Sequence, residues 1–325
     1  MHRSRQYRGA AAAVLSFAAL MIAFWFVGAH FRVTENLTDH LPSAVLSFAL
    51  LLAPYWGFGF GLDAWLRRNL ISPAARILAP VLLVVPYLVF VVPRGQFRWD
   101  MCLGMLGAVL AIALLLNGAQ AAAPHWRDWL ALAILGVAVD LHLFDRAWPA
   151  PGLAAIPKLL FVDMGLYGFL VLRPIGGIGY DFRARISDFK IGLGEFLWFT
   201  PIALAFGLLT SFLHFHPTWS DPVWFCSGWL FTLFFIAVPE ELFFRGLIMN
   251  LLERKAGTRR ALWITAVLFG LAHFNKRTAF FNWRYVVLAA IAGVFYGRAW
   301  LAERRLLASS VTHATVDTVW SIWLR

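Results

Sequence analysis

Apolar residues fill most of the chain in runs of about 20, and short polar segments separate these runs. A helix of that length can cross the hydrocarbon core of a bilayer. The first half contains six such windows, near residues 10–30, 43–65, 75–93, 101–122, 129–144 and 157–172. The second half contains five, near residues 191–213, 223–253, 261–275, 284–302 and 307–323. The pattern therefore predicts an all-α, polytopic transmembrane helical bundle of about 11 spans.

The composition is typical of a membrane protein. Hydrophobic residues make up 61% of the 325 positions and charged residues only 14%, whereas a soluble domain has about 25% charged residues. The formal net charge of +11 could indicate a nucleic-acid partner, but Lys and Arg lie mostly in short loops between the apolar runs. This is the positive-inside pattern, so we expect a lipid bilayer and no nucleic acid around the chain.

The basic loops also predict an orientation. Three arginines precede the first apolar run, and the length of that run favours an uncleaved first span over a signal peptide. With the N-terminus inside, the basic segments at 67–68, 127, 173–190 and 253–260 all lie in the cytoplasm. The segment 31–42, which contains Glu35 and Asp39, then lies outside.

A segment rich in glycine and charge, residues 173–185, divides the chain into two halves. Its glycines do not make a phosphate loop, because no Gly-Lys-Ser or Gly-Lys-Thr follows and no strand precedes. We place the domain boundary near residue 185. Residues 1–185 form an N-terminal transmembrane region whose role the sequence leaves open. Residues 186–325 form a C-terminal domain that carries most of the polar residues at membrane depth.

Three charged residues interrupt the longest apolar run of this C-terminal domain: Glu240, Glu241 and Arg245. An ionised group at membrane depth costs several kcal/mol, about 2.5–3.5 on insertion scales, so these groups need partners or a function. On a helix, Glu241 and Arg245 stand at i and i+4 and can pair, whereas Glu240 is rotated by about 100°. The spacing indicates one structural and one working carboxylate. The alternative is a buried ion pair that only locks helices together.

Two further polar pairs have helical spacing: Phe269 with His273, and His313 with Asp317. Alone, each is typical of a hydrogen bond between helices. Together with Glu240 they could hydrolyse a substrate, because a desolvated glutamate can take a proton from water while a histidine orients that water. A second histidine and a side-chain donor could stabilise the oxyanion. The sequence contains neither GxSxG nor HExxH, so it does not predict a serine hydrolase or a zincin.

Three segments of the chain resemble, in the same order, the three motifs of a known family. They are Glu240-Glu241-x-x-x-Arg245, Phe269-x-x-x-His273 and His313-x-x-x-Asp317. That family is the CAAX protease and bacteriocin-processing (CPBP) family of membrane endopeptidases, also called the Abi family. The resemblance covers about residues 186–325, which are therefore predicted to form a CPBP-like core, and says nothing about the first half.

The resemblance implies an intramembrane endopeptidase that depends on glutamate and uses no metal or other cofactor. By position, Glu240 would activate water together with His273, while His313 and Asp317 would form the oxyanion side. Many members carry Asn where this chain has Asp317, and an ionised carboxylate cannot donate a hydrogen bond. The implied substrate is a membrane-associated peptide or protein cleaved near the membrane surface.

The family pattern also implies supporting roles. Arg245 would hold Glu241 and its helix in place, and Phe269 would support the second motif. A bacterial-type cytoplasmic membrane is the implied location.

Three alternatives remain open at the level of sequence. Zinc could be bound by Glu240, His273 and His313, although the set lacks a close i,i+4 ligand pair. A non-catalytic scaffold, an immunity protein or a peptide-sequestering partner could use the same polar network for structure or for binding. A transporter with a proton relay is the third, but the sequence shows no inverted repeat.

Overall fold

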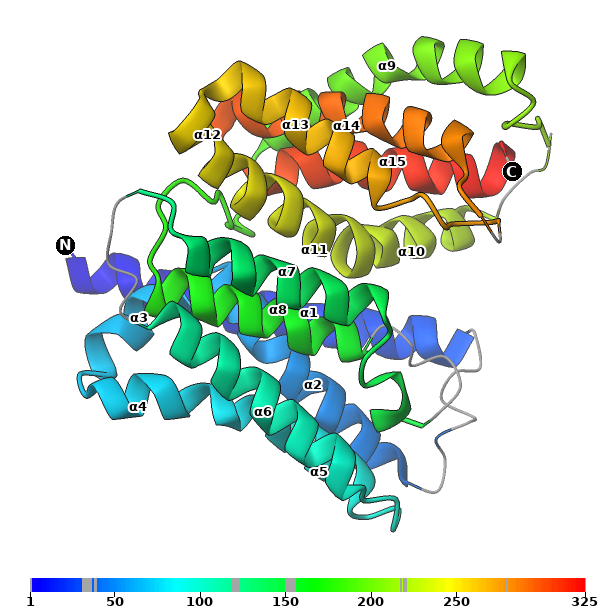
Figure 1. Cartoon of the computed structure of the whole chain (residues 1–325). Helices are drawn as coiled ribbons and strands as arrows, with labels where there is room; N and C mark the ends of the chain where they lie inside the picture. Colours follow the sequence, from blue (N-terminus) through cyan, green and yellow to red (C-terminus); the bar gives the residue numbers. More distant parts are fainter. Residues whose placement is uncertain are drawn as a thin grey trace. The chain divides into compact units, whose positions relative to one another are not determined.

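The computed structural model describes residues 2–30, 37, 40–117, 123–149, 156–216, 218, 221–278 and 280–324. Every regular element within these residues is a helix, which confirms the all-α prediction. The chain divides into two compact units, Met1–Ile175 and Gly176–Arg325, and Figure 1 labels their helices. Glu35 and Asp39, from the predicted outside loop, lie outside the described residues.

The first unit contains helices α1 (His2–His30), α2 (Leu41–Phe58), α3 (Leu62–Asn69), α4 (Pro73–Leu78), α5 (Val85–Val91), α6 (Trp99–Leu116), α7 (Trp126–Asp140) and α8 (Ile156–Tyr167). A 3-10 segment, Ala79–Val84, joins α4 to α5, and a π-helical segment, Gly168–Leu172, extends α8. Helix α2 packs against α5 and α8, and α6 packs against α7. A buried ion pair closes the end of this unit, with Arg173 Nε 3.0 Å from Asp128 Oδ1.

The second unit contains helices α9 (Ile186–Leu209), α10 (Pro222–Thr232), α11 (Val238–Glu241), α12 (Asn250–Ala256), α13 (Thr258–Leu271), α14 (Trp283–Glu303) and α15 (Leu306–Trp323). Helices α9, α14 and α15 pack against one another, and α13 lies along α14 (Figure 1). The second motif begins on α13 and ends just after it, the third lies on α15, and the first lies on α11 and the segment that follows it, so packing of these helices can bring the motifs together.

Helices α10 to α12 form one continuous run, Pro222–Ala256, that carries the first motif. Two π-helical segments, Leu233–Ala237 and Leu242–Met249, flank α11 on either side. Pro239 has no N–H, so a regular α-helical ladder cannot continue through it. π-Helical turns are frequent at functional sites because they re-aim side chains. The two adjacent glutamates thus lie on a single α-helical turn between two changes of pitch.

Within the described ranges, seven helical segments are long and apolar enough to cross a membrane. They are Ala11–Ala29, Leu41–Phe58, Pro73–Val91, Trp99–Leu116, Ile186–Leu209, Pro222–Ala256 and Trp283–Glu303. The protein is therefore an integral, multi-pass membrane protein. Helices also form in the four other predicted windows, 129–144, 157–172, 261–275 and 307–323. These helices, α7, α8, α13 and α15, are not among the seven candidate spans. The count of about 11 spans stays a prediction.

Along the chain, the first compact unit ends at Ile175 and the second begins at Gly176. The sequence places the domain boundary near residue 185. Part of the linker packs onto the second unit, where Trp300 Nε1 donates to the Ile178 carbonyl over 3.1 Å. Gly179 has a φ of +79°, and a Cβ there would lie 2.2 Å from the Arg304 carbonyl oxygen. Only glycine fits this close approach, so Gly179 serves packing.

A buried ion cluster ties the start of α9 to the start of α15. Arg305 Nε lies 2.6 Å from Asp188 Oδ1, and Nη1 lies 3.1 Å from Asp181 Oδ2. Arg305 Nη2 also donates to the Arg183 carbonyl over 2.8 Å. Asp188 is fully buried, and Arg305 is only 4% exposed. Arg305 directly precedes α15, so this cluster fixes the start of the helix that carries the third motif.

We expect Arg305→Gln to lower the free energy of unfolding by about 3–5 kcal/mol, because it leaves Asp188 buried without a counter-charge. The thermal unfolding midpoint of the purified protein in detergent measures this loss. Lys190→Gln is the control, because Lys190 is exposed on α9, the helix that carries Asp188. This substitution should leave the midpoint unchanged. An Arg305→Gln protein with the wild-type midpoint would contradict the role of the cluster.

Candidate active site

Arg245 and Glu241 form a fully buried ion pair one helical turn apart. Arg245 Nη1 lies 2.9 Å from Glu241 Oε1, and neither side chain has any solvent-exposed surface. Arg245 Nη2 also donates to the Gly293 carbonyl on α14 over 2.9 Å. A Cβ at position 293 would lie 3.0 Å from Ala266 Cα, so glycine permits the close packing of α13 and α14 beside this contact. The pair therefore joins the first motif to α14.

Aromatic rings surround the buried guanidinium. The Arg245 Cζ atom lies 4.6 Å from the ring centroid of Phe269 and 5.2 Å from that of Tyr296. A guanidinium over an aromatic face gains electrostatic attraction, most strongly where water is excluded. Phe269 of the second motif thus contacts Arg245 of the first.

Glu241 has two further partners on α15. Its Oε2 accepts from the Ser309 hydroxyl, and its Oε1 accepts from His313 Nδ1 over 2.8 Å. Ser309 also lies 2.9 Å from the Tyr296 carbonyl oxygen. Both oxygens of this carboxylate are therefore engaged, and Glu241 binds the first motif to the third.

The neighbouring carboxylate, Glu240, has a different environment. Its side chain is 37% exposed, and its Oε2 lies 3.8 Å from His313 Nε2. That distance exceeds the usual 2.7–3.2 Å of an N–H···O hydrogen bond. Two adjacent glutamates on α11 thus lie near the same imidazole, one buried with both oxygens hydrogen-bonded and the other partly exposed.

His313 lies between three carboxylates. Its Nδ1 bonds to Glu241, while its Nε2 lies 3.4 Å from Asp317 Oδ2 as well as facing Glu240. Its ring stacks on Tyr296, with centroids 4.5 Å apart and planes 17° from parallel. Carboxylate oxygens accept hydrogen bonds, so both ring nitrogens are placed to donate. The short bond at Nδ1 fixes the ring, and the long contacts at Nε2 leave that N–H available.

His273 is held differently. Its Nδ1 lies 2.8 Å from the Phe269 carbonyl oxygen, one turn back on α13. Since a carbonyl can only accept, Nδ1 carries the hydrogen and Nε2 of the neutral ring is left as an acceptor. Among the described residues His273 makes no hydrogen bond to either glutamate. It lines the same cavity as His313 and Asp317.

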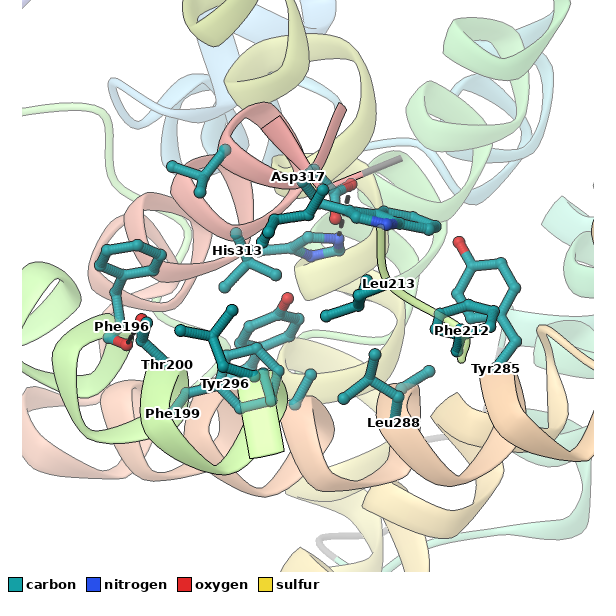
Figure 2. A pocket seen from close by; sticks show the side chains of 18 of the residues that line it. Phe196, Phe199, Thr200, Phe212, Leu213, Tyr285, Leu288, Tyr296, His313 and Asp317 are labelled. Atoms are coloured by element: carbon teal, nitrogen blue, oxygen red, sulfur yellow. Dashed lines mark hydrogen bonds and ion pairs between the residues drawn. The ribbon is translucent and has the colours of Figure 1, made fainter. Parts of the chain in front are cut away.

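The cavity lies within the second unit and is lined mainly by α9, α14 and α15. Figure 2 shows His313 and Asp317 joined at one side of it and Phe196, Phe199 and Leu288 along its wall. Most of its lining is apolar, and the polar side chains that reach it are Thr200, His273, Tyr285, Tyr296, His313 and Asp317. Glu240 does not line this space; its partly exposed carboxylate reaches His313 at Nε2.

The site residues predicted from sequence fall into two groups. Glu240, Glu241, His313 and Asp317 form one connected cluster, whereas His273 joins them only through the shared cavity. The sequence analysis missed Ser309. It lies one turn before His313 and two before Asp317 on the same face of α15, a polar spacing that could have revealed it.

Among the described residues, no group of three or more His, Cys, Asp or Glu side chains is arranged to hold a metal ion. The ligand set of the zinc alternative was Glu240, His273 and His313. One ring nitrogen of each of these histidines is already bonded to protein oxygen. The absence of a metal nevertheless stays a prediction, to be tested by chelation.

The second unit thus combines apolar helices with an acid–base cluster beside an apolar cavity, the features of a hydrolase in a membrane. Residues 222–319 match a family model described as type II CAAX prenyl endopeptidase Rce1-like. The match includes all three motifs and confirms the predicted family resemblance for these residues of the second unit. No curated protein and no solved structure was found to match the chain. The first unit lies outside the matched residues.

We expect Arg245→Ala to lower the free energy of unfolding by about 3–5 kcal/mol, because Glu241 would remain buried without its counter-charge. Thermal unfolding in detergent measures the change. Arg259→Ala serves as the control, since Arg259 is exposed near the start of α13. If Arg245→Ala proved as stable as the wild type, the ion pair would not be what holds the first motif in place.

Two adjacent serines on α15 allow a matched comparison. Ser309→Ala should lower the free energy of unfolding by about 1–3 kcal/mol, because a buried Glu241 oxygen loses its donor. Ser310 is also buried, but its hydroxyl has no hydrogen-bond partner among the described residues. Ser310→Ala should therefore be neutral or slightly stabilising. Equal effects of the two substitutions on the unfolding midpoint would exclude a specific role for Ser309.

Proposed function

We propose that the second unit is a glutamate-dependent intramembrane endopeptidase. The domain family supports protease activity in general. The observation that carries the finer proposal is the contrast between Glu240 and Glu241 at His313. Glu241 is fully buried with both oxygens hydrogen-bonded and has no access to water, whereas Glu240 is partly exposed beside an N–H donor and can take a proton from water. Glu240 is therefore the general base and Glu241 its structural neighbour.

In the proposed reaction, Glu240 accepts one proton from a water molecule. The water oxygen forms a bond to the carbonyl carbon of the scissile peptide, and the electron pair of the C=O bond moves to the carbonyl oxygen. His273 Nε2, the free acceptor of that ring, binds the second hydrogen of the water and orients it. Glu240 and His273 thus share the water between them without a metal.

His313 would stabilise the oxyanion that forms. Its Nδ1 is committed to Glu241, so the ring is held in one orientation. Its Nε2 has only long contacts, 3.4 Å to Asp317 and 3.8 Å to Glu240, and its N–H can turn to a substrate oxygen. One positioned donor of this kind is worth about 10²–10³-fold in rate.

Collapse of the tetrahedral intermediate completes the reaction. The C=O bond re-forms and the C–N bond breaks, while the leaving nitrogen takes the proton that Glu240 holds. The products are one peptide with a new carboxylate and one with a new amine, and Glu240 returns to its starting state.

The surroundings of the site support a membrane-associated peptide or protein as the substrate. The cavity beside His313 and Asp317 is lined mostly by apolar side chains from α9, α14 and α15. Such a lining binds apolar side chains and excludes water, which strengthens electrostatic stabilisation inside the site.

We expect Glu240→Gln to reduce cleavage by about 10²–10⁴-fold while leaving the unfolding midpoint near the wild-type value, because Glu240 is partly exposed and forms no short ion pair. Glu241→Gln is the matched variant. It should lower the unfolding midpoint, since Arg245 would stay buried without its counter-charge.

The assay co-expresses each variant with candidate membrane proteins and detects new N-termini by mass spectrometry, with and without a chelator. A product that forms with the wild type, survives chelation and is absent with Glu240→Gln supports the proposal. Loss of the product on chelation would indicate zinc instead. Full activity of Glu240→Gln, or its unfolding, would favour the non-catalytic alternative, in which the carboxylates serve structure.

A further inference from the structure

The oxyanion side of the site has one clear donor and one group that opposes it. His313 can offer an N–H, but Asp317 lies 3.4 Å from it and, when ionised, is an acceptor only. A carboxylate close to a developing oxyanion also repels it. A second neutral donor would offset that repulsion, and two tyrosines, Tyr285 and Tyr296, line the cavity.

Tyr285 is placed between the two sides of the site. It lies in the first turn of α14, with its ring centroid 4.9 Å from that of His273 and 5.3 Å from that of Trp320. The carboxylates of Glu240 and Asp317 both lie within electrostatic reach of its phenol. Figure 2 shows Tyr285 on the wall of the cavity that also holds Asp317. The residue therefore adjoins both the water side and the oxyanion side.

The hydroxyl of Tyr285 is uncommitted. It makes no hydrogen bond to any residue in the described part of the chain, and it is not sealed off, because the side chain is only partly buried. A buried phenol normally finds a partner for its O–H. The ring contacts with His273 and Trp320 fix the position of the ring without using the hydroxyl.

Tyr296 is bound into the structure more tightly. Its ring stacks on His313 at 4.5 Å and also receives the Arg245 guanidinium at 5.2 Å, and only 2% of the residue is exposed. These contacts explain Tyr296 as a support for His313 and Arg245. Tyr285 packs against Phe212, His273 and Trp320, and none of these ring contacts supports Arg245 or His313.

We propose that Tyr285 is a further catalytic residue, whose hydroxyl donates a hydrogen bond to the substrate carbonyl oxygen as that oxygen becomes the oxyanion. The role rests on the proposed endopeptidase function. The phenol keeps its proton throughout: the proton of the attacking water goes to Glu240, and the negative charge on the former carbonyl oxygen is shared between the His313 N–H and the Tyr285 O–H. A neutral donor does this without placing another charge in the membrane.

The direct test is Tyr285→Phe, which removes the hydroxyl and keeps the ring beside His273 and Trp320. The enzyme is reconstituted in phosphatidylcholine–phosphatidylglycerol vesicles and assayed with a library of quenched-fluorescent peptides rich in apolar residues. We expect kcat to fall by about 10²-fold with KM little changed, because the bond forms only in the transition state. The unfolding midpoint should stay at the wild-type value.

Two other tyrosines give controls. Tyr167→Phe, in the first unit, removes a hydroxyl that donates to the Arg76 carbonyl over 2.7 Å and should leave kcat unchanged. Tyr296→Phe keeps the ring that supports His313 and should change kcat far less than Tyr285→Phe. A large loss of kcat with Tyr296→Phe and none with Tyr285→Phe would overturn the assignment.

The two proposals fail in different ways. If wild type cleaves the peptides, Glu240→Gln does not, and Tyr285→Phe has wild-type kcat, the tyrosine role is wrong and the protease function stands. If wild type cleaves no peptide of the library, or Glu240→Gln cleaves as well as wild type, the proposed function fails and the tyrosine role fails with it.

A second variant covers the case in which Tyr285→Phe does not fold. Replacement of Tyr285 by 3,5-difluorotyrosine keeps the shape and the hydroxyl but makes the phenol a stronger acid. If the protonated phenol donates in the transition state, the alkaline limb of the kcat profile should move to lower pH. An unchanged profile would contradict the role, since a purely structural ring would not alter it.

Discussion

The second unit depends on one constraint: a buried arginine in a membrane helix must keep a carboxylate beside it. Arg245 and Glu241 satisfy that constraint by themselves, but a carboxylate has lone pairs beyond those that one guanidinium uses. Two of the remaining ones are met by Ser309 and His313 on α15, and the second guanidinium nitrogen donates to the Gly293 carbonyl on α14. Satisfying one ion pair therefore draws three helices to a common point. The geometry around His313 is a consequence of that requirement.

The same constraint explains why neighbouring glutamates differ. On one turn of α11, Glu241 points to the interior, where its oxygens accept hydrogen bonds from Arg245 and His313. The next residue back, Glu240, is rotated away, and its side chain stays partly exposed. Both still meet His313, because that imidazole has a nitrogen on each side. Glu241 holds the His313 ring at Nδ1, while Glu240 lies farther away near Nε2. The ring is therefore fixed in place, and its Nε2 can still bind a substrate atom.

Sequence reasoning was strongest where the relevant partners share a helix. The spacing of Glu241 and Arg245 is enough to predict their contact, and the order of the motifs is enough to predict the family. It was weakest across helices. Ser309 and Tyr285 reach the site only after α14 and α15 are packed, and a hydroxyl in an apolar run costs too little to draw attention as a charge does.

The boundary and span predictions show the same limit. Gly179 belongs to a segment that looks like a flexible linker, yet it packs closely against Arg304. The domain boundary depends on that tertiary contact, and no local pattern contains it. Helices α13 and α15 likewise carry site residues, so part of their surface faces the bundle. Hydropathy alone therefore cannot decide whether such a helix crosses the bilayer.

The π-helical segment Leu233–Ala237 has a further consequence for how the site can change over time. A π-helical turn holds one residue more than an α-helical turn, and the two turns cover nearly the same angle. One residue can therefore be added or lost within this segment while Glu240 and Glu241 keep their direction relative to α10. A change of length in the regular part of α10 would instead rotate both carboxylates by about 100°. The π-helical segment is thus the place in this helix where the chain length can vary without turning the active site away.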